Sequence, residues 1–90
     1  MNTYMVIATF SPEDDLPLMN TVLEAEVAQV HALRADGRLG AVHVSPARGA
    51  VFLEVFADDE DSARTTVMTL PMATWWAIDL FPTVSPPPPR

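Results

Sequence analysis

The order of its apolar and helix-like segments constrains the fold of this chain more than any other feature. Four short runs rich in apolar, β-branched and aromatic residues predict strands. One longer segment with helical spacing follows the first run, and another follows the third. The predicted strands are residues 4–10, 39–45, 50–56 and 75–81. This order predicts an α+β domain in which two helices cover one face of a four-stranded antiparallel sheet.

The first helical segment has clear start and stop signals. Glu13, Asp14 and Asp15 place carboxylates at its beginning, where they favour the positive end of the helix dipole, and Gly37 is a natural stop after Asp36. At about 100° per residue, its apolar residues fall within one arc of roughly 140°, which predicts a helix with one buried side. The residues of this arc are Leu16, Met19, Val22, Leu23, Val27, Val30 and Leu33.

The remaining segments are bounded by proline and glycine. The turn at residues 46–49, which contains Pro46 and Gly49, predicts a β-hairpin between the second and third strands. A second helix at residues 58–70 begins with acidic residues and ends before Pro71, and its narrow apolar face consists of Ala63, Val67 and Leu70. Residues 1–85 therefore form a single domain, and residues 86–90 form an extended proline-rich tail.

The charge balance and the missing residue types exclude several classes of function. Twelve acidic residues face five basic residues, and the net charge of −7 repels phosphate and anionic lipid, so we expect neither nucleic-acid nor membrane partners. Cysteine is absent, which excludes disulfides and thiolate sites. The two histidines lack metal-ligand spacing and no glycine-rich phosphate loop is present, so we expect no metal and no cofactor. The first apolar run is too short for a signal or membrane segment, and we expect a cytoplasmic protein.

The predicted strands are apolar on both alternations. In the third strand Val51, Leu53 and Val55 oppose Phe52, Glu54 and Phe56. If both helices cover one face of the sheet, the other face exposes a large apolar patch, and such patches normally mark interfaces. We therefore expect a homodimer in which two sheets face each other, or a larger homo-oligomer built from such dimers.

Glu26 fits the helix pattern least well. On the helical wheel it lies near the middle of the apolar arc, roughly 20° from Met19, whereas His31 lies outside the arc and is expected to reach solvent. A desolvated carboxylate either pairs, accepts hydrogen bonds or has a pKa raised toward the range useful for proton transfer. Glu26 is therefore either a structural carboxylate or a candidate catalytic base.

Three more polar residues, His43, Glu54 and Asp79, interrupt apolar strands. If they face one apolar cavity, they form the sparse polar set typical of a small-molecule pocket; the alternative for each is a position at a sheet edge or an interface. Trp75 and Trp76 are adjacent, so in a strand one packs in the core and the other can wall a pocket. We expect the catalytic residues to be Glu26 and His43, and the residues that contact the ligand to be Tyr4, Glu54, Trp75 and Asp79.

Short motifs over nearly the whole chain resemble those of muconolactone delta-isomerases. They are Asp15-Leu16-Pro17, Asp36-Gly37-Arg38-Leu39, Leu70-Pro71, and Ile78-Asp79-Leu80 with Pro82. The resemblance implies a ferredoxin-like fold, a dimeric α/β barrel and a cofactor-free 1,3-proton shift in an unsaturated lactone of aromatic catabolism. It also implies acids at Glu26 and Asp79. Polar positions of that family are occupied here by Met5, Ile7, Val27 and Val44, so the cationic clamp for a ligand carboxylate is missing and we expect an apolar or lactone-like ligand.

Two classes of function are consistent with these features. The first is an enzyme that moves a proton next to a carbonyl group, either an isomerase or a cyclase of polyketide-type tailoring, with Glu26 or His43 as the base. The second is a non-catalytic ligand-binding or structural oligomer of the same fold. Convergence of Glu26 and His43 on one cavity would discriminate between these classes.

Overall fold

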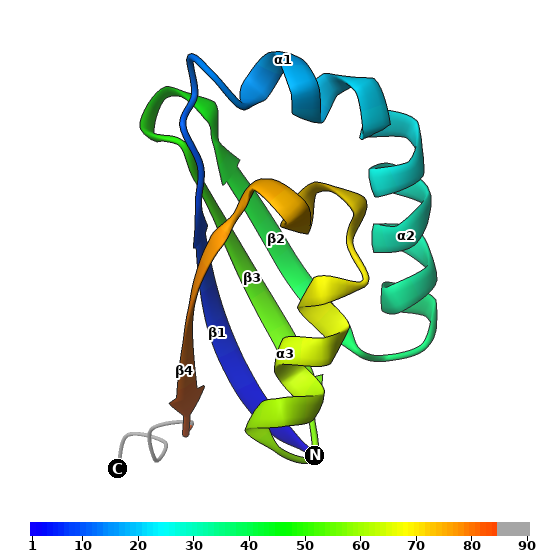
Figure 1. Ribbon diagram of the computed structural model, residues 1–90. Coiled ribbons are helices and arrows are strands. Elements are labelled where there is room, and N and C mark those ends of the chain that lie inside the picture. Colours follow the sequence, from blue (N-terminus) through cyan, green and yellow to red (C-terminus); the bar gives the residue numbers. More distant parts are fainter. Residues whose placement is uncertain (85–90) are drawn as a thin grey trace, which may run out of the picture.

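Four antiparallel strands form one sheet in the order β2-β3-β1-β4 (Figure 1). The structure is a computed structural model that describes residues 1–84, so the predicted tail at residues 86–90 lies outside the described residues. The strands are β1 (Asn2–Thr9), β2 (Leu39–Ser45), β3 (Ala50–Ala57) and β4 (Ala77–Thr83). Each lies within two residues of its predicted bounds, and the strand order confirms the predicted α+β, ferredoxin-like arrangement.

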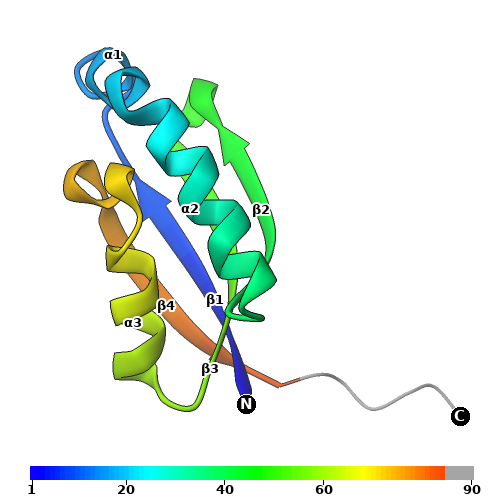
Figure 2. The ribbon, with the colours of Figure 1, turned by 90° about the vertical axis from the view of Figure 1, so that its right-hand side faces the viewer.

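The two longer helices, α2 (Leu23–Ala35) and α3 (Glu60–Met68), lie side by side on the same face of the sheet (Figure 2). Leu53, Val6 and Val55 of the sheet and Leu70 and Val67 of the helical layer are less than 2% exposed. The core is therefore the layer between sheet and helices, and within β1 the buried residues Tyr4, Val6 and Ala8 alternate with more exposed ones. None of the helices among residues 1–84 is long and apolar enough to span a membrane.

The opposite face of the sheet has no helical cover. Met5 of β1, Phe52 of β3 and Phe81 of β4 lie on it and are 37%, 39% and 49% exposed. Their neighbours along each strand point into the core, because successive side chains of a strand point to opposite faces. The expected open apolar face is thus present in the subunit.

The first helical segment is interrupted, which differs from the single regular helix that we predicted. A short helix, α1 (Leu16–Met19), continues into a 3₁₀ turn, η1 (Asn20–Val22), and α2 begins only after Val22 leaves helical geometry with φ −115° and ψ 16°. The interruption changes the direction of the apolar arc. Leu23 and Val27 are consequently about half exposed, and the prediction that they are buried was wrong. The other five residues of the predicted arc do pack against the core or belong to it.

The last strand begins later than predicted. Pro71 opens a 3₁₀ turn, η3 (Pro71–Trp75), in which proline suits the first positions because it has no N–H to leave unpaired. Trp75 therefore closes this turn, and only Trp76, with φ −99° and ψ 140°, has extended geometry before β4 begins. The interpretation of both tryptophans as strand residues was therefore wrong, since Trp75 belongs to η3 and Trp76 precedes the first residue of β4.

Candidate functional site

A cavity of about 370 Å³ lies between the helical layer and the sheet. Its walls come from α1 and η1, from one side of α2, from β2 and β3, and from Met72 and Trp76 in the segment that precedes β4. Most of the lining is apolar: Phe10, Leu16, Met19, Val30, Val42, Val51, Leu53 and Met72 contribute to it. This volume and this lining are typical of a site for a small apolar molecule.

Glu26 is the only carboxylate among the residues that line this cavity. The side chain is 8% exposed, and its Oε1 accepts a hydrogen bond of 3.0 Å from the backbone N–H of Met72. Burial raises the pKa of Glu26 above the ordinary glutamate value, and the Met72 hydrogen bond opposes part of this effect. Within residues 1–84 no second hydrogen bond to this carboxylate is found, so Oε2 is free to take a proton or contact a ligand.

Trp76 supplies a second polar group at the same cavity. Its ring lines the cavity wall, and its indole Nε1 is buried without a hydrogen-bond partner among the described residues. Buried indole N–H groups usually have a partner, and leaving one unpaired costs about 1 to 3 kcal/mol. The lining of the cavity thus includes the acid Glu26 and a tryptophan whose buried N–H is unpaired within residues 1–84.

The remaining polar groups lie toward the mouth of the cavity. Arg34 uses its Nε to donate a 3.1 Å hydrogen bond to the carbonyl of Gly40, which ties α2 to β2. His31 is exposed, as predicted, and lines the mouth together with the half-exposed Leu23 and Val27. The interior is therefore apolar apart from Glu26 and Trp76.

The structure separates the predicted site residues into different places. His43, Glu54 and Asp79 lie on the open face of the sheet, away from the Glu26 cavity. For His43 this follows from its neighbours, because Val42 and Val44 line the cavity and His43 points the other way. Glu26 and His43 therefore do not converge on one cavity in the subunit.

Tyr4 and Trp75 also lie outside the cavity lining. Tyr4 is 6% exposed and belongs to the core between sheet and helices, and Trp75 packs against that core from η3. Sequence reasoning missed Trp76 because the strand was taken to begin two residues too early. The pairing of two tryptophans did indicate that one of them could wall a pocket.

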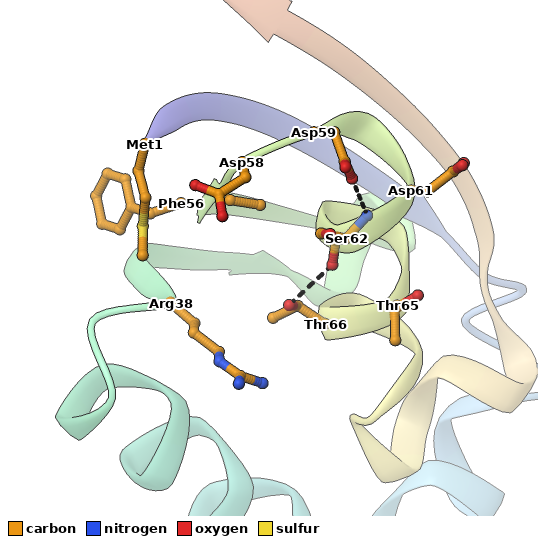
Figure 3. A pocket seen from close by; sticks show the side chains of 10 residues that line it. Met1, Arg38, Phe56, Asp58, Asp59, Asp61, Ser62, Thr65 and Thr66 are labelled. Atoms are coloured by element: carbon orange, nitrogen blue, oxygen red, sulfur yellow. Dashed lines mark hydrogen bonds between the residues drawn. The ribbon is translucent and has the colours of Figure 1, made fainter.

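A second hollow, of about 450 Å³, lies at the start of α3 (Figure 3). Its lining is largely polar and includes Arg38 and Asp58. Its polar groups already stabilise the helix, since Asp59 Oδ1 accepts a 2.8 Å hydrogen bond from the N–H of Ser62 and Thr66 Oγ1 donates to the Ser62 carbonyl. Accepting that bond lowers the pKa of Asp59. Helix capping, which the acidic run predicts, accounts for Asp59 in this hollow.

No group of three or more His, Asp or Glu residues within residues 1–84 is arranged to hold a metal ion. Compared with models of known protein families and with curated proteins, the chain matches none. The function must therefore be argued from the cavity itself.

Proposed function

We propose that the protein is a cofactor-free isomerase that shifts a proton next to a carbonyl group, with Glu26 as the base. The observation that carries this proposal is a single carboxylate, 8% exposed, in the wall of an otherwise apolar cavity. A base of raised pKa accepts a proton from carbon more readily than an ordinary glutamate. The motifs that resemble muconolactone delta-isomerases support the same chemistry and membership of that family.

The reaction proceeds in two proton transfers. The Glu26 carboxylate removes a proton from the carbon next to the carbonyl, and the electron pair of that C–H bond moves into a dienolate. The protonated Glu26 then returns the proton to the γ carbon, and the double bond shifts by one position. No electrons are gained or lost, so the step needs no redox cofactor.

Trp76 is the donor that we assign to the carbonyl oxygen of the substrate. The negative charge of the dienolate accumulates on that oxygen, and a preorganised N–H stabilises it most effectively in an apolar site. Trp76 Nε1 has no other partner within the described residues. Protein atoms cover Nε1, so in this proposal the indole ring turns when the ligand binds, and its N–H then donates to the carbonyl and is no longer unpaired.

The charges around the cavity favour a neutral substrate. Arg34 donates its Nε to Gly40, and Val27 and Val44 are uncharged residues of the cavity lining. Arg34 is exposed, whereas Glu26 is the buried charged residue of the lining, so a substrate carboxylate beside Glu26 would meet a like charge. We therefore propose a small, neutral, unsaturated lactone or a similar carbonyl compound as the substrate class.

A β,γ-unsaturated γ-lactone in deuterated buffer provides the test. Proton NMR should detect conversion to the α,β-isomer together with deuterium incorporation, and Glu26→Gln should slow both by about 10² or more. Trp76→Phe, which keeps the ring and removes the N–H, should reduce turnover by about tenfold or more. Glu24→Gln, an exposed glutamate of the same helix, serves as the matched control and should retain full activity.

A non-catalytic binding protein is the second candidate. Two observations favour it. Glu26 and His43 do not share a cavity. Glu26 also accepts a hydrogen bond from the N–H of Met72, and a carboxylate that fixes η3 against α2 has a structural use without chemistry. Binding of the lactone without turnover or deuterium exchange would support this candidate and contradict the isomerase.

We also propose that the protein is a cytoplasmic homodimer formed through the open face of the sheet. Exposed Met5, Phe52 and Phe81 on one face support this, because a large contiguous apolar patch normally marks an interface. Sedimentation equilibrium at micromolar concentration should give twice the 9.8 kDa mass of the chain or a multiple of it. A folded monomer in that experiment would contradict the proposal.

A further inference from the structure

Four residues from four different strands form one row across the open face of the sheet. The register pairs His43 with Phe52, Phe52 with Ile7, and Ile7 with Asp79. From the β2 edge to the β4 edge, the row therefore consists of a base, two apolar side chains and an acid. His43 and Asp79 are exposed at its two ends.

This row is complementary to the same row of a second copy that runs in the opposite direction. A second copy turned by 180° about an axis parallel to the strands, and placed face to face, would bring its β4 over β2 and its β1 over β3. His43 would then oppose the partner's Asp79, and Phe52 would oppose the partner's Ile7. Symmetry repeats each contact, as in any isologous interface.

We infer that this row sets the two-fold axis of the subunit pair, with His43 hydrogen-bonded to the partner's Asp79 at both ends. The inference rests on the proposed dimer and adds its axis and its pairing residues. An imidazole N–H donates to a carboxylate whether or not the ring is charged. Sheets packed face to face lie about 10 Å apart and within about 30° of alignment, so side chains of facing rows meet between them.

The neighbouring row fits the same axis. Its residues, paired by register, are Glu54, Met5 and Phe81, and the β2 end of this row lies at an irregularity where Gly40 contributes no side chain. Glu54 leans over this point, because its Oε1 accepts the backbone N–H of Ala41 at 3.2 Å. With the axis parallel to the strands, the partner's Phe81 lies above β2 at this point. Because Gly40 has no side chain, the Glu54 carboxylate lies over it, and the partner's Phe81 would pack against the Glu54 side chain.

The other simple arrangement of two facing sheets is less favourable. With an axis perpendicular to the strands, each β2 would face the partner's β2 and each β4 the partner's β4. His43 would then face the partner's β2, which contributes another histidine. Asp79 would face the partner's β4, which contributes another acid. Like charges facing each other across an interface are unfavourable, so the charge pattern selects the parallel axis.

Exchange of the two end residues tests this axis. The dimer dissociation constant of the full chain would be measured by sedimentation for His43→Asp, for Asp79→His and for the double exchange. Each single variant should raise the constant by about tenfold or more, because it places like groups opposite each other twice. The double exchange should return it to within about threefold of the unaltered protein. His31→Asp and Asp36→His, on the helical layer, are the matched controls and should have no effect.

Cross-linking provides a measurement that does not depend on these affinities. The chain contains no cysteine, so His43→Cys and Asp79→Cys each introduce a single thiol. A bismaleimide that spans about 10 Å, the distance between facing sheets, should cross-link a mixture of the two variants and leave each variant alone largely uncross-linked.

Each result separates this inference from the proposals on which it rests. Two results would overturn the axis but leave the dimer standing. The first is a double-exchange variant that dimerises as weakly as the single variants. The second is a His43→Cys variant that cross-links to another copy of itself. A monomeric protein overturns both the dimer and the axis. The lactone assay is independent of both, because Glu26 lies in a cavity on the other face of the sheet.

Discussion

Replacement of Glu26 by glutamine should change how the stability of the protein depends on pH. Burial raises the pKa of Glu26 in the folded state, so between the ordinary glutamate value and this raised value the folded state binds more protons than the unfolded state. The free energy of unfolding then falls as pH rises through that window, by at most about 1.4 kcal/mol per pH unit. Stability from Glu26 is thus present at low pH and lost above its folded pKa.

Glutamine removes the titration and keeps an oxygen for the Met72 N–H, which donates to Glu26 at 3.0 Å. The stability of Glu26→Gln relative to the unaltered protein should therefore increase from pH 4.5 or so toward pH 8. Glu26→Ala also removes the acceptor, and it should be less stable than Glu26→Gln by about 1 to 3 kcal/mol because a buried N–H is left unpaired.

Urea unfolding followed by far-UV circular dichroism at a fixed protein concentration measures these differences. Concentration is held fixed because the stability of an oligomer depends on it. Glu24→Gln, on the exposed side of α2, should change stability by less than about 0.5 kcal/mol at every pH. If the difference between Glu26→Gln and the unaltered protein does not vary with pH, or if it decreases as pH rises, the argument from burial is refuted.

Two further predictions concern the framework of the fold. Gly49→Ala should destabilise the protein by more than about 1 kcal/mol, because Gly49 has φ +60° and an added Cβ would clash with the Phe10 carbonyl oxygen. Gly37→Ala is the control, since Gly37 also has a positive φ but has open space around it. Equal losses of stability for the two variants in thermal unfolding would contradict this reasoning. Asp59→Ala should destabilise α3 at pH 7 but have little effect near pH 2, because the lowered pKa of Asp59 means that its contribution is lost as pH falls through that value. Thermal unfolding followed by circular dichroism at both pH values would test this, with Asp61→Ala as the control. If Asp59→Ala still lowers the stability at pH 2, the capping carboxylate is not the cause of the lower stability.

The layout of the fold could be predicted from the sequence because each strand and helix has its own local signal. Alternation and apolar runs indicate strands, and the Pro46–Gly49 turn fixes the β2-β3 hairpin. The interruption at Val22 could not be predicted, since nothing in residues 20–22 excludes a helix. The start of β4 was missed for a related reason, because tryptophan is common in strands and Trp75 nevertheless ends a 3₁₀ turn.

The candidate site was predictable only in part. Glu26 could be identified because a regular helix puts it among apolar neighbours, and it is in fact buried. His43 could not be assigned to a face of the sheet, since both alternations of β2 are apolar apart from His43 and Ser45. The register with Phe52 resolves that ambiguity and moves His43 away from Glu26. Trp76 depended on the strand boundary, which is the least certain part of any assignment made from sequence.

The central place of β1 in the sheet has a consequence for the order of folding. β1 pairs with β3 and β4, so that Thr3 is matched with Thr83 from the other end of the described chain, whereas β2 and β3 are joined by a short turn. Loop closure makes distant pairings slower than local ones. During synthesis β1 emerges first but must wait for β3 and then β4, and its apolar side chains stay exposed until they arrive. We expect pulse-labelled hydrogen exchange to detect protection of the β2-β3 amides before those between β1 and β4.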